Sequence, residues 1–386
     1  MFRPNQPFRG IAIPDEKEII YNNADDYYQA LLHDIDQAEK TIDMETFIFS
    51  NDFLGECVAE HLANAAKRGV KIRLLIDGMG ALFWGSGIEK TLTDAGIDWR
   101  VYHPAPWRLW QWKHSNYLNK HIMLRAMHFL AAVNSRNHRK ITVVDNKIAW
   151  IGSVNVTASH LSKQQGGEDW RDTCVRMKDL DFRDLTLALE AEFYGEHYQR
   201  LFNTELYNRI FRLNNTLFRR RYTYRGMLRK IRRARERIWI TNAYFVPDIR
   251  LLRVLREAAW IGVDVRVMFP ANNNHIFMNW ASSVFYEALL KAGIKIFEYL
   301  PGMLHAKSMI VDDWFIVGSS NLNHRSVFRD FEVDVVISAN KAKLDLENNY
   351  VDDLEHSRQI TLTSFERHSF LKRMMGHVAL LFRYFL

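Results

Sequence analysis

The 386-residue sequence is 48% hydrophobic and 25% charged, which excludes an intrinsically disordered or fibrous protein. Its length predicts two domains or one large divided domain, and its net charge of +7 favours anionic partners such as nucleic acid, anionic lipid or a phosphate ester. Its two cysteines exclude a disulfide framework, no apolar run reaches the roughly 18 residues of a spanning helix, and the N-terminus does not resemble a signal peptide.

The first unit of strands and helices occupies residues 38–97. Apolar residues from 44 to 49 predict a buried strand, the helical pattern after them ends at Gly69, and residues 70–75 predict the next strand. A second helical pattern ends at Gly96, and glycine is the residue that most often closes a helix. This alternation predicts an α/β lobe with a mixed, largely parallel sheet and helices on both faces.

An insertion at residues 103–137 follows this unit and has no long counterpart later in the chain. No acidic residue occurs from position 99 to 144, whereas basic and aromatic residues are frequent and include Trp107, Trp110 and Trp112. We expect these tryptophans to bind the interface of a membrane, where indole rings lie among the headgroups and cations contact anionic lipid. Stacking on single-stranded nucleic acid and packing as an ordinary loop are the alternatives.

The first functional motif begins directly after this insertion. It consists of His138, Lys140 and Asp145, and Ser153 and Asn155 follow in a Gly-Ser-x-Asn sequence. Residues two apart on a strand face the same side, so the histidine and the lysine are expected to point into one cavity. The aspartate has an odd offset from the lysine, and we expect it to support the site structurally.

A basic connector at residues 201–233 separates a first lobe at residues 1–200 from a second lobe at residues 234–352. Its basic residues include Arg209, Arg212, Arg219, Arg220, Arg221, Arg225, Arg229, Lys230, Arg232 and Arg233. A solvated helical connector and a cationic face for anionic lipid headgroups are both compatible with this composition.

The second lobe repeats the pattern of the first. Its motif consists of His305, Lys307, Asp312, Ser319 and Asn321. The spacing of His, Lys and Asp is identical in the two motifs, and the Gly-Ser-x-Asn sequence shifts by one residue. Two such copies within a repeat are not a coincidence, so the sequence predicts one site built from both motifs.

The residue types of the two motifs suit the chemistry of a phosphodiester. The lysines supply positive charge, and Ser hydroxyls and Asn amides are neutral donors to phosphate oxygens. Together they would stabilise a trigonal-bipyramidal transition state without a metal ion. We therefore expect Ser153, Asn155, Ser319 and Asn321 to bind phosphate, and we expect neither a metal nor a cofactor.

The tail at residues 353–386 is basic, aromatic and apolar. Its apolar runs are short and are interrupted by charged residues, so it is not expected to span a bilayer comfortably. Two structures are compatible with this pattern: an amphipathic anchor in the membrane interface, or a core helix folded back on the second lobe.

The duplicated His-x-Lys-x4-Asp motif resembles the phospholipase D superfamily over about residues 20–350. Further similarity to its bacterial cardiolipin synthase branch lies at residues 44–49, 68–71, 242–245 and 318–322. The resemblance implies two lobes related by a pseudo-twofold axis, with one site between them. It also implies a ping-pong mechanism, in which one histidine forms a phosphohistidine and the other protonates the leaving alcohol and deprotonates the incoming one.

This resemblance also implies roles for individual residues. His138 is the nucleophile and His305 is the general acid and base by analogy, and the sequence alone leaves the reverse assignment open. The family places an acidic residue downstream of each motif to orient the imidazole. The candidates are Asp172, with Asp169 as a competitor, and Glu332.

The activity that the resemblance implies is cardiolipin synthesis, by transfer of a phosphatidyl group between two phosphatidylglycerol molecules with release of glycerol. The first alternative is a phospholipase D-type hydrolase or another phosphatidyltransferase, and the second is a nucleic-acid phosphodiesterase. The expected partners are anionic phospholipids and the membrane surface rather than nucleic acid. The expected location is peripheral, on the bacterial cytoplasmic membrane, and the oligomeric state is left open.

Overall fold

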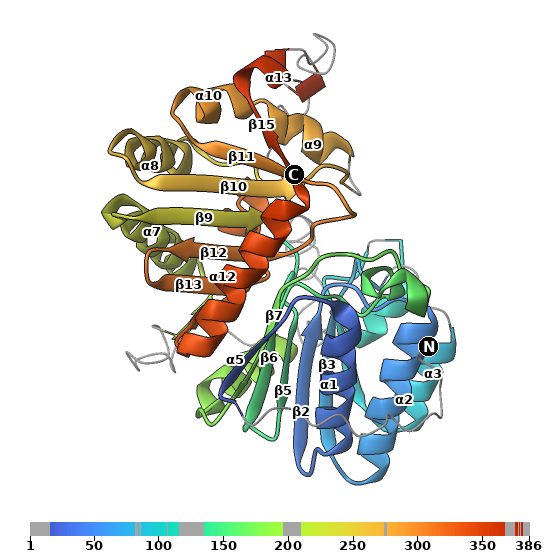
Figure 1. Ribbon diagram of the computed structural model, residues 1–386. Helices are drawn as coiled ribbons and strands as arrows, with labels where there is room; N and C mark the ends of the chain where they lie inside the picture. Colours follow the sequence, from blue (N-terminus) through green and yellow to red (C-terminus); the bar gives the residue numbers. More distant parts are fainter. Residues whose placement is uncertain are drawn as a thin grey trace.

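A computed structural model describes residues 16–81, 84, 86–105, 107–115, 135–195, 210–273 and 276–366, together with positions 375, 376, 378 and 380. Within these ranges the chain forms two α/β lobes, each built on one mixed sheet with helices packed against it (Figure 1). The prediction of two related α/β lobes is confirmed.

The first lobe contains a seven-stranded sheet in the described residues, with the strand order β1-β7-β6-β5-β2-β3-β4. Its elements are β1 (Glu18–Tyr21), α1 (Ala24–Asp36), β2 (Thr41–Thr46), α2 (Phe53–Lys67), β3 (Lys71–Asp77), α3 (Ser86–Asp94), β4 (Asp98–Tyr102), η1 (Leu109–His114), β5 (Ile141–Val144), β6 (Ile148–Gly152), η2 (Ala158–His160), η3 (Lys163–Gln165), β7 (Cys174–Lys178) and α5 (Arg183–Phe193).

The second lobe contains an eight-stranded sheet in the described residues, with the strand order β15-β11-β10-β9-β12-β13-β14-β8. Its elements are β8 (Phe211–Leu213), α7 (Leu217–Arg233), β9 (Arg237–Asn242), α8 (Ile249–Trp260), β10 (Asp264–Pro270), α9 (Ile276–Ser283), α10 (Tyr286–Lys291), β11 (Lys295–Tyr299), β12 (Lys307–Val311), β13 (Trp314–Gly318), α11 (His324–Phe328), β14 (Val333–Ile337), α12 (Asn340–Glu355), β15 (Ser357–Ile360) and α13 (Leu362–Glu366).

Local signals in the sequence set the ends of equivalent helices in the two lobes. Asp52 caps α2, and Asp248 caps α8, by accepting hydrogen bonds from two backbone N–H groups at the start of each helix. Gly69 and Gly262 follow these helices with φ of 94° and 93°, a left-handed conformation that glycine adopts without strain. The same start and stop therefore direct the chain into β3 in one lobe and β10 in the other.

Only part of each sheet is parallel, which corrects the prediction of largely parallel sheets. Strands β2, β3 and β4 are parallel, as are β9, β10 and β11. The other neighbouring strands of the two described sheets are antiparallel. Asp145 and Asn146, with φ of 53° and 55°, form a tight turn from β5 to β6, and such a turn joins antiparallel neighbours without a crossover helix.

The second lobe extends beyond residues 234–352 at both ends. Strand β8 and helix α7, which lie in the predicted connector, belong to it, because β8 pairs with β14 and α7 packs beside α8. Strand β15 continues the same sheet past residue 352 by pairing with β11. Residues 201–209 and most of the tail after residue 366 lie outside the described residues, so the amphipathic anchor stays a prediction.

The two lobes pack through the antiparallel parts of their sheets and share a hydrophobic core. Ile151 of β6 and Val175 of β7 lie in this core with Val317 of β13 and Val335 of β14, and all four are buried. Helix α12 of the second lobe begins beside β1 of the first (Figure 1), where Glu18 accepts hydrogen bonds from two backbone N–H groups just before the helix. This packing holds the lobes in one arrangement, so side chains from both can build one site.

Candidate active site

The two histidine motifs lie where the lobes meet, directly before β5 and β12. The backbone N–H of His138 donates to the carbonyl oxygen of Phe331 at 2.9 Å, and the backbone N–H of His305 donates to the carbonyl oxygen of Arg171 at 2.8 Å. Each of these carbonyl groups belongs to the other lobe and comes immediately before an acidic residue. The backbone therefore brings each histidine to an acid from the opposite lobe.

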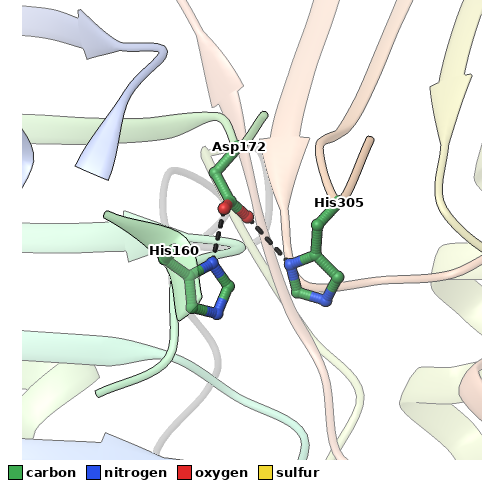
Figure 2. A group of neighbouring side chains, drawn as sticks. All are labelled: His160, Asp172 and His305. Carbon is green, nitrogen blue, oxygen red and sulfur yellow. Dashed lines mark hydrogen bonds and ion pairs between the residues drawn. The ribbon is translucent and has the colours of Figure 1, made fainter. Parts of the chain in front are cut away.

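The orienting acids are exchanged between the lobes. Nδ1 of His138 lies 3.1 Å from both carboxylate oxygens of Glu332, and Nδ1 of His305 lies 2.8 Å from Oδ1 of Asp172 (Figure 2). Each acid follows the motif of its own lobe in sequence but contacts the histidine of the other. Asp169, the competitor, accepts a hydrogen bond from a nearby backbone N–H instead, and its side chain is 44% exposed.

Two buried lysines accompany the histidines. The ammonium group of Lys140 donates to the carbonyl oxygen of His138 at 2.7 Å, and that of Lys307 donates to the carbonyl oxygen of His305 at 2.5 Å. Burial lowers the pKa of Lys140 to about 7, and burial with the nearby charge of Lys140 holds the pKa of Lys307 well below its usual value. An anion beside these groups would compensate for their lost hydration, so the pair is suited to a phosphate group.

Competitive inhibition by sulfate is expected to weaken as the pH rises through about 7, because Lys140 is an ammonium below its lowered pKa and a neutral amine above it. Sulfate stays a dianion through this range, so a change in its inhibition constant reports on the protein. Lys140→Met is expected to flatten the pH dependence. Lys163→Met, which removes an exposed lysine, is the control and should leave it intact. A pH-independent inhibition constant in the wild type would contradict the prediction.

The neutral imidazole is the form in which both histidines are held. Burial and the charges of Lys140 and Lys307 hold the pKa of His138 well below its usual range, and burial and Lys307 do the same to the pKa of His305. Nδ1 of each ring is directed at a carboxylate, so Nδ1 carries the proton and Nε2 carries the lone pair. Nε2 is therefore the nitrogen available to attack phosphorus or to accept a proton.

The two acids have different ionisation properties. Burial alone would raise the pKa of Asp172, but contacts with His160 and His305 outweigh it and hold this pKa well below its usual value. Burial raises the pKa of Glu332 to about 8, although Lys140 and two serine hydroxyls act in the opposite direction. The two halves of the site are therefore related in geometry but not in charge.

The serines of the Gly-Ser-x-Asn sequences bind the acids, which corrects their prediction as phosphate ligands. Ser153 Oγ donates to Oδ1 of Asp172 at 2.7 Å, and Ser319 Oγ donates to Oε2 of Glu332. Each hydroxyl oxygen also accepts a hydrogen bond from a backbone N–H at 3.0 Å. The hydroxyl proton of each serine is thus used within the protein, where it holds a carboxylate that orients a histidine.

The two asparagines differ in their contacts. Oδ1 of Asn155 accepts a hydrogen bond from the backbone N–H of Ile48 at 3.2 Å, so this side chain stabilises the loop after β2. Oδ1 of Asn321 is buried and has no hydrogen-bond partner in the described part of the chain. Phosphate binding therefore stays a prediction for Asn321, whereas Asn155 has a structural partner.

The glycines of these sequences allow the acids to approach. A Cβ atom at Gly152 would lie 2.6 Å from the carbonyl oxygen of Thr173, and one at Gly318 would lie 2.4 Å from that of Val333. Both distances are shorter than any real contact of this kind. The absence of a side chain therefore lets β6 and β13 pack against the segments that carry the acids.

Asp145 and Asp312, the aspartates of the two motifs, lie at the opposite ends of β5 and β12 from the histidines. The carboxylate of Asp145 accepts hydrogen bonds of 2.7 to 2.9 Å from the backbone N–H groups of residues 39–41. The carboxylate of Asp312 accepts three of 2.9 to 3.0 Å from residues 235–237. Their role is structural, as their offset predicts, but they act from a turn and not from the far face of a strand.

The described part of the insertion packs on the first lobe. Gln111 is buried and donates to a backbone carbonyl of that lobe at 2.9 Å. The side chain of Trp107 is 68% exposed and that of Trp112 is partly buried, whereas the side chain of Trp110 and residues 116–134 lie outside the described residues. Membrane contact by the three tryptophans stays a prediction, and the exposure of Trp107 is compatible with it.

Sequence reasoning missed His160. This side chain is buried, and its Nδ1 lies 2.5 Å from Oδ2 of Asp172 (Figure 2). A signal was available, because His160 follows Asn155 at the same distance at which Ser326 follows Asn321. A residue-by-residue comparison of the repeats would have shown that a histidine replaces a serine beside one of the two acids.

Comparisons with known proteins identify the family of the chain. A family model described as "Cardiolipin synthase, PLD-like domain" matches residues 31–169 and 227–354, which include both histidine motifs. A cardiolipin synthase of Clostridium perfringens is 32% identical, over 92% of this chain and 74% of its own length. Cardiolipin synthase 1 of Bacillus cereus is 28% identical, over 92% of this chain and 70% of its own length.

Among solved structures, a phosphatidylserine synthase from Haemophilus influenzae is similar to this chain with a TM-score of 0.64. The similarity covers 97% of each chain at 12% sequence identity, and it shows the fold alone. The fold, the duplicated motif and the family match agree. The chain belongs to the cardiolipin synthase family of phospholipase D-like proteins.

Proposed function

We propose that this protein is a phosphatidyltransferase that makes cardiolipin from two molecules of phosphatidylglycerol and releases glycerol. The observation that carries the proposal is the pair of neutral, carboxylate-oriented imidazoles of His138 and His305, with two buried lysines beside them. Membership of the cardiolipin synthase family supports the choice of lipid substrate.

The first half-reaction transfers the phosphatidyl group to the protein. Nε2 of His138 attacks phosphorus, and the bond between phosphorus and the headgroup oxygen breaks. The electron pair stays on that oxygen, which takes a proton from Nε2 of His305, and glycerol leaves. Binding of the anionic phosphate raises the proton affinity of His305, so the ring holds this proton when it is needed.

The second half-reaction transfers the group to the second lipid. Nε2 of His305 accepts the proton of the headgroup hydroxyl of another phosphatidylglycerol, and that oxygen attacks phosphorus. The bond between phosphorus and His138 breaks, its electron pair returns to the imidazole, and cardiolipin is released. Lys140 and Lys307 neutralise the charge of the phosphate oxygens in both steps, so the same buried cations serve two transition states.

Product analysis tests the proposal directly. Purified protein is incubated with vesicles of phosphatidylglycerol that carries a labelled headgroup, and the lipids are separated. Cardiolipin and free labelled glycerol in equal amounts would support the transferase. Phosphatidic acid with glycerol would indicate a hydrolase, and a product that appears only when phosphatidylethanolamine is added would indicate another phosphatidyltransferase. Cleavage of single-stranded nucleic acid without reaction on lipid would refute the proposal.

We also propose that the protein acts peripherally on the cytoplasmic membrane. Leu217 and Phe218 of α7, Ile249 of α8 and Phe277 of α9 are large apolar side chains that are 57 to 76% exposed. Helices α8 and α9 follow β9 and β10 in the chain, and α7 begins shortly after Asn214, which binds the backbone of the orienting acid before β14. These exposed apolar residues all lie at the starts of their helices and support contact with lipid.

No helix within the described ranges has both the length and the apolar character needed to cross a bilayer. The basic residues of α7 add positive charge beside Leu217 and Phe218. Cations next to exposed apolar side chains favour a surface of anionic lipid. The exposed apolar and basic side chains of α7 thus support the proposed contact with the membrane surface.

Replacement of Trp107, Trp110 and Trp112 by alanine is expected to weaken binding to phosphatidylglycerol vesicles by roughly tenfold, because indole rings are favoured at the headgroup level. Sedimentation with vesicles measures the effect. Trp260→Ala is the matched control, since this indole is 63% exposed but lies at the end of α8 remote from Ile249. Equal binding by the triple variant and the control would indicate that the insertion is an ordinary loop without a role in membrane binding.

A further inference from the structure

His160 contacts the carboxylate that orients His305. Its Nδ1 lies 2.5 Å from Oδ2 of Asp172, the oxygen that His305 does not use (Figure 2). Its Nε2 lies 3.3 Å from the backbone nitrogen of Asn155, a group that can only donate. Nε2 therefore accepts, and the proton of this ring lies on Nδ1 and is donated to Asp172.

Asp172 accepts hydrogen bonds from three side chains. The donors are His160, His305 and Ser153, at 2.5, 2.8 and 2.7 Å, and every one of these side chains is buried. A carboxylate with several donors is stabilised in its charged form. The low pKa of Asp172 agrees with this geometry.

The equivalent position in the other lobe is Ser326. It donates to Oε1 of Glu332 at 2.6 Å, so a hydroxyl occupies the place that an imidazole occupies beside Asp172. The rest of the arrangement is shared, since Ser319 matches Ser153. His160 is therefore the main difference between the donors of the two acids.

We propose that His160 is a positioning residue, which acts through Asp172 to fix the tautomer of His305 and to assign that histidine the proton transfers of the reaction. The inference rests on the proposed function, whose two half-reactions need one histidine to carry a proton. A charged carboxylate stabilises the imidazolium that forms when His305 takes up a proton. Glu332 has no imidazole donor besides His138 in the described residues, and it stabilises an imidazolium less.

His160, Asp172 and His305 also form the one group in the described residues whose ligand atoms are close enough to hold a metal ion, all within 4.8 Å of one another. A metal would need a lone pair on Nδ1 of His160. The hydrogen bond from Asn155 to Nε2 keeps the proton on Nδ1 instead. The geometry thus favours a chain of hydrogen bonds over a metal site.

Two variants and two substrates test the inference. His160→Phe keeps a ring but removes the donor, and His160→Asn keeps a donor near the position of Nδ1. Turnover is measured on phosphatidylglycerol, and the rate of the initial p-nitrophenol burst is measured on a phosphatidyl ester of p-nitrophenol, because this leaving group needs no proton and the burst precedes the second half-reaction. His160→Phe is expected to lower turnover of phosphatidylglycerol by about 10- to 100-fold and release of p-nitrophenol far less, with substantial recovery in His160→Asn.

The pH profile supplies a readout that a purely structural role would not change. In His160→Phe, Asp172 keeps the donors His305 and Ser153 and stays charged. His160 lowers the pKa of His305, so its removal raises this pKa, and the basic limb of kcat/KM for phosphatidylglycerol is expected to move to higher pH. His356→Phe, at an exposed histidine, is the matched control and should behave as wild type. Ser326→Ala should instead lower turnover of both substrates equally, because it acts on the side of His138.

The outcomes separate the inference from the proposed function. Equal losses on both substrates with an unshifted pH profile would overturn the role of His160, even if cardiolipin is the product. If phosphatidic acid is the product while His160→Phe still affects only the substrate that needs a proton, the transferase fails and the role of His160 stands. Loss of wild-type activity on addition of EDTA, with recovery on addition of zinc, would indicate a metal site and would also overturn the inference.

Discussion

Alanine at His138 or at His305 is expected to lower turnover of phosphatidylglycerol by on the order of 10⁴-fold or more. His138→Ala removes the atom that bonds to phosphorus, and His305→Ala removes the group that moves the proton of both alcohols. Circular dichroism should show that both variants fold. His356→Ala is the matched control, because this exposed histidine lies at the end of α12 and its side chain hydrogen-bonds to the backbone carbonyl of Asp352.

An activated lipid separates the roles of the two histidines. p-Nitrophenolate leaves without a proton, so His305→Ala should still release it from the phosphatidyl ester in a burst of one equivalent per site. His138→Ala should give no burst, since no phosphohistidine can form. A burst in His138→Ala and none in His305→Ala would reverse the assignment, and substantial turnover of phosphatidylglycerol by both variants would refute the shared site.

Asp172→Asn is expected to lower kcat by about 10³- to 10⁴-fold with little change in KM. An amide can donate a hydrogen bond to Nδ1 of His305, which moves the proton of the ring to Nε2, where the reaction needs a lone pair. The lysines still bind the phosphate group, so substrate affinity should change little. Steady-state kinetics on phosphatidylglycerol vesicles give both constants.

The control for this prediction is Asp169→Asn. Asp169 is close in sequence and carries the same charge, but it contacts Lys163 and no histidine. Its φ of 56° is a conformation that asparagine tolerates, so the variant should fold and keep the wild-type kcat. Similar losses in the two variants would mean that charge near the site, and not the orientation of His305, sets the rate.

The histidines and lysines of the site were predictable because the chain carries them twice at identical spacing. Their partners were not, since nothing in the spacing of Asp172 or Glu332 indicates that each turns toward the other lobe. The exchange depends on backbone pairing of Arg171 with Leu304, and of residue 137 with Phe331, which forms only when the sheets pack. The roles of the serines were wrong for the same reason.

The lobes and their order of helices and strands followed from glycine punctuation and apolar periodicity. The direction of the later strands did not, although Asp145 and Asn146 are residue types that favour a tight hairpin turn. Recognition of this two-residue turn would have predicted that β5 and β6 are antiparallel. The edges of the second lobe were misjudged because the charge of α7 hides an apolar side formed by Tyr224, Met227 and Ile231.

The exchange of acids between lobes has a consequence for biosynthesis. The ribosome makes the first lobe before the second, so His138 emerges well before Glu332 exists to orient it. Asp172 is likewise synthesised before His305, the histidine that it orients. Neither lobe alone contains His138 or His305 together with the acid that orients it, so we expect a first lobe made without the second to be inactive. We therefore expect reactivity toward lipid to begin only after both lobes have folded against each other.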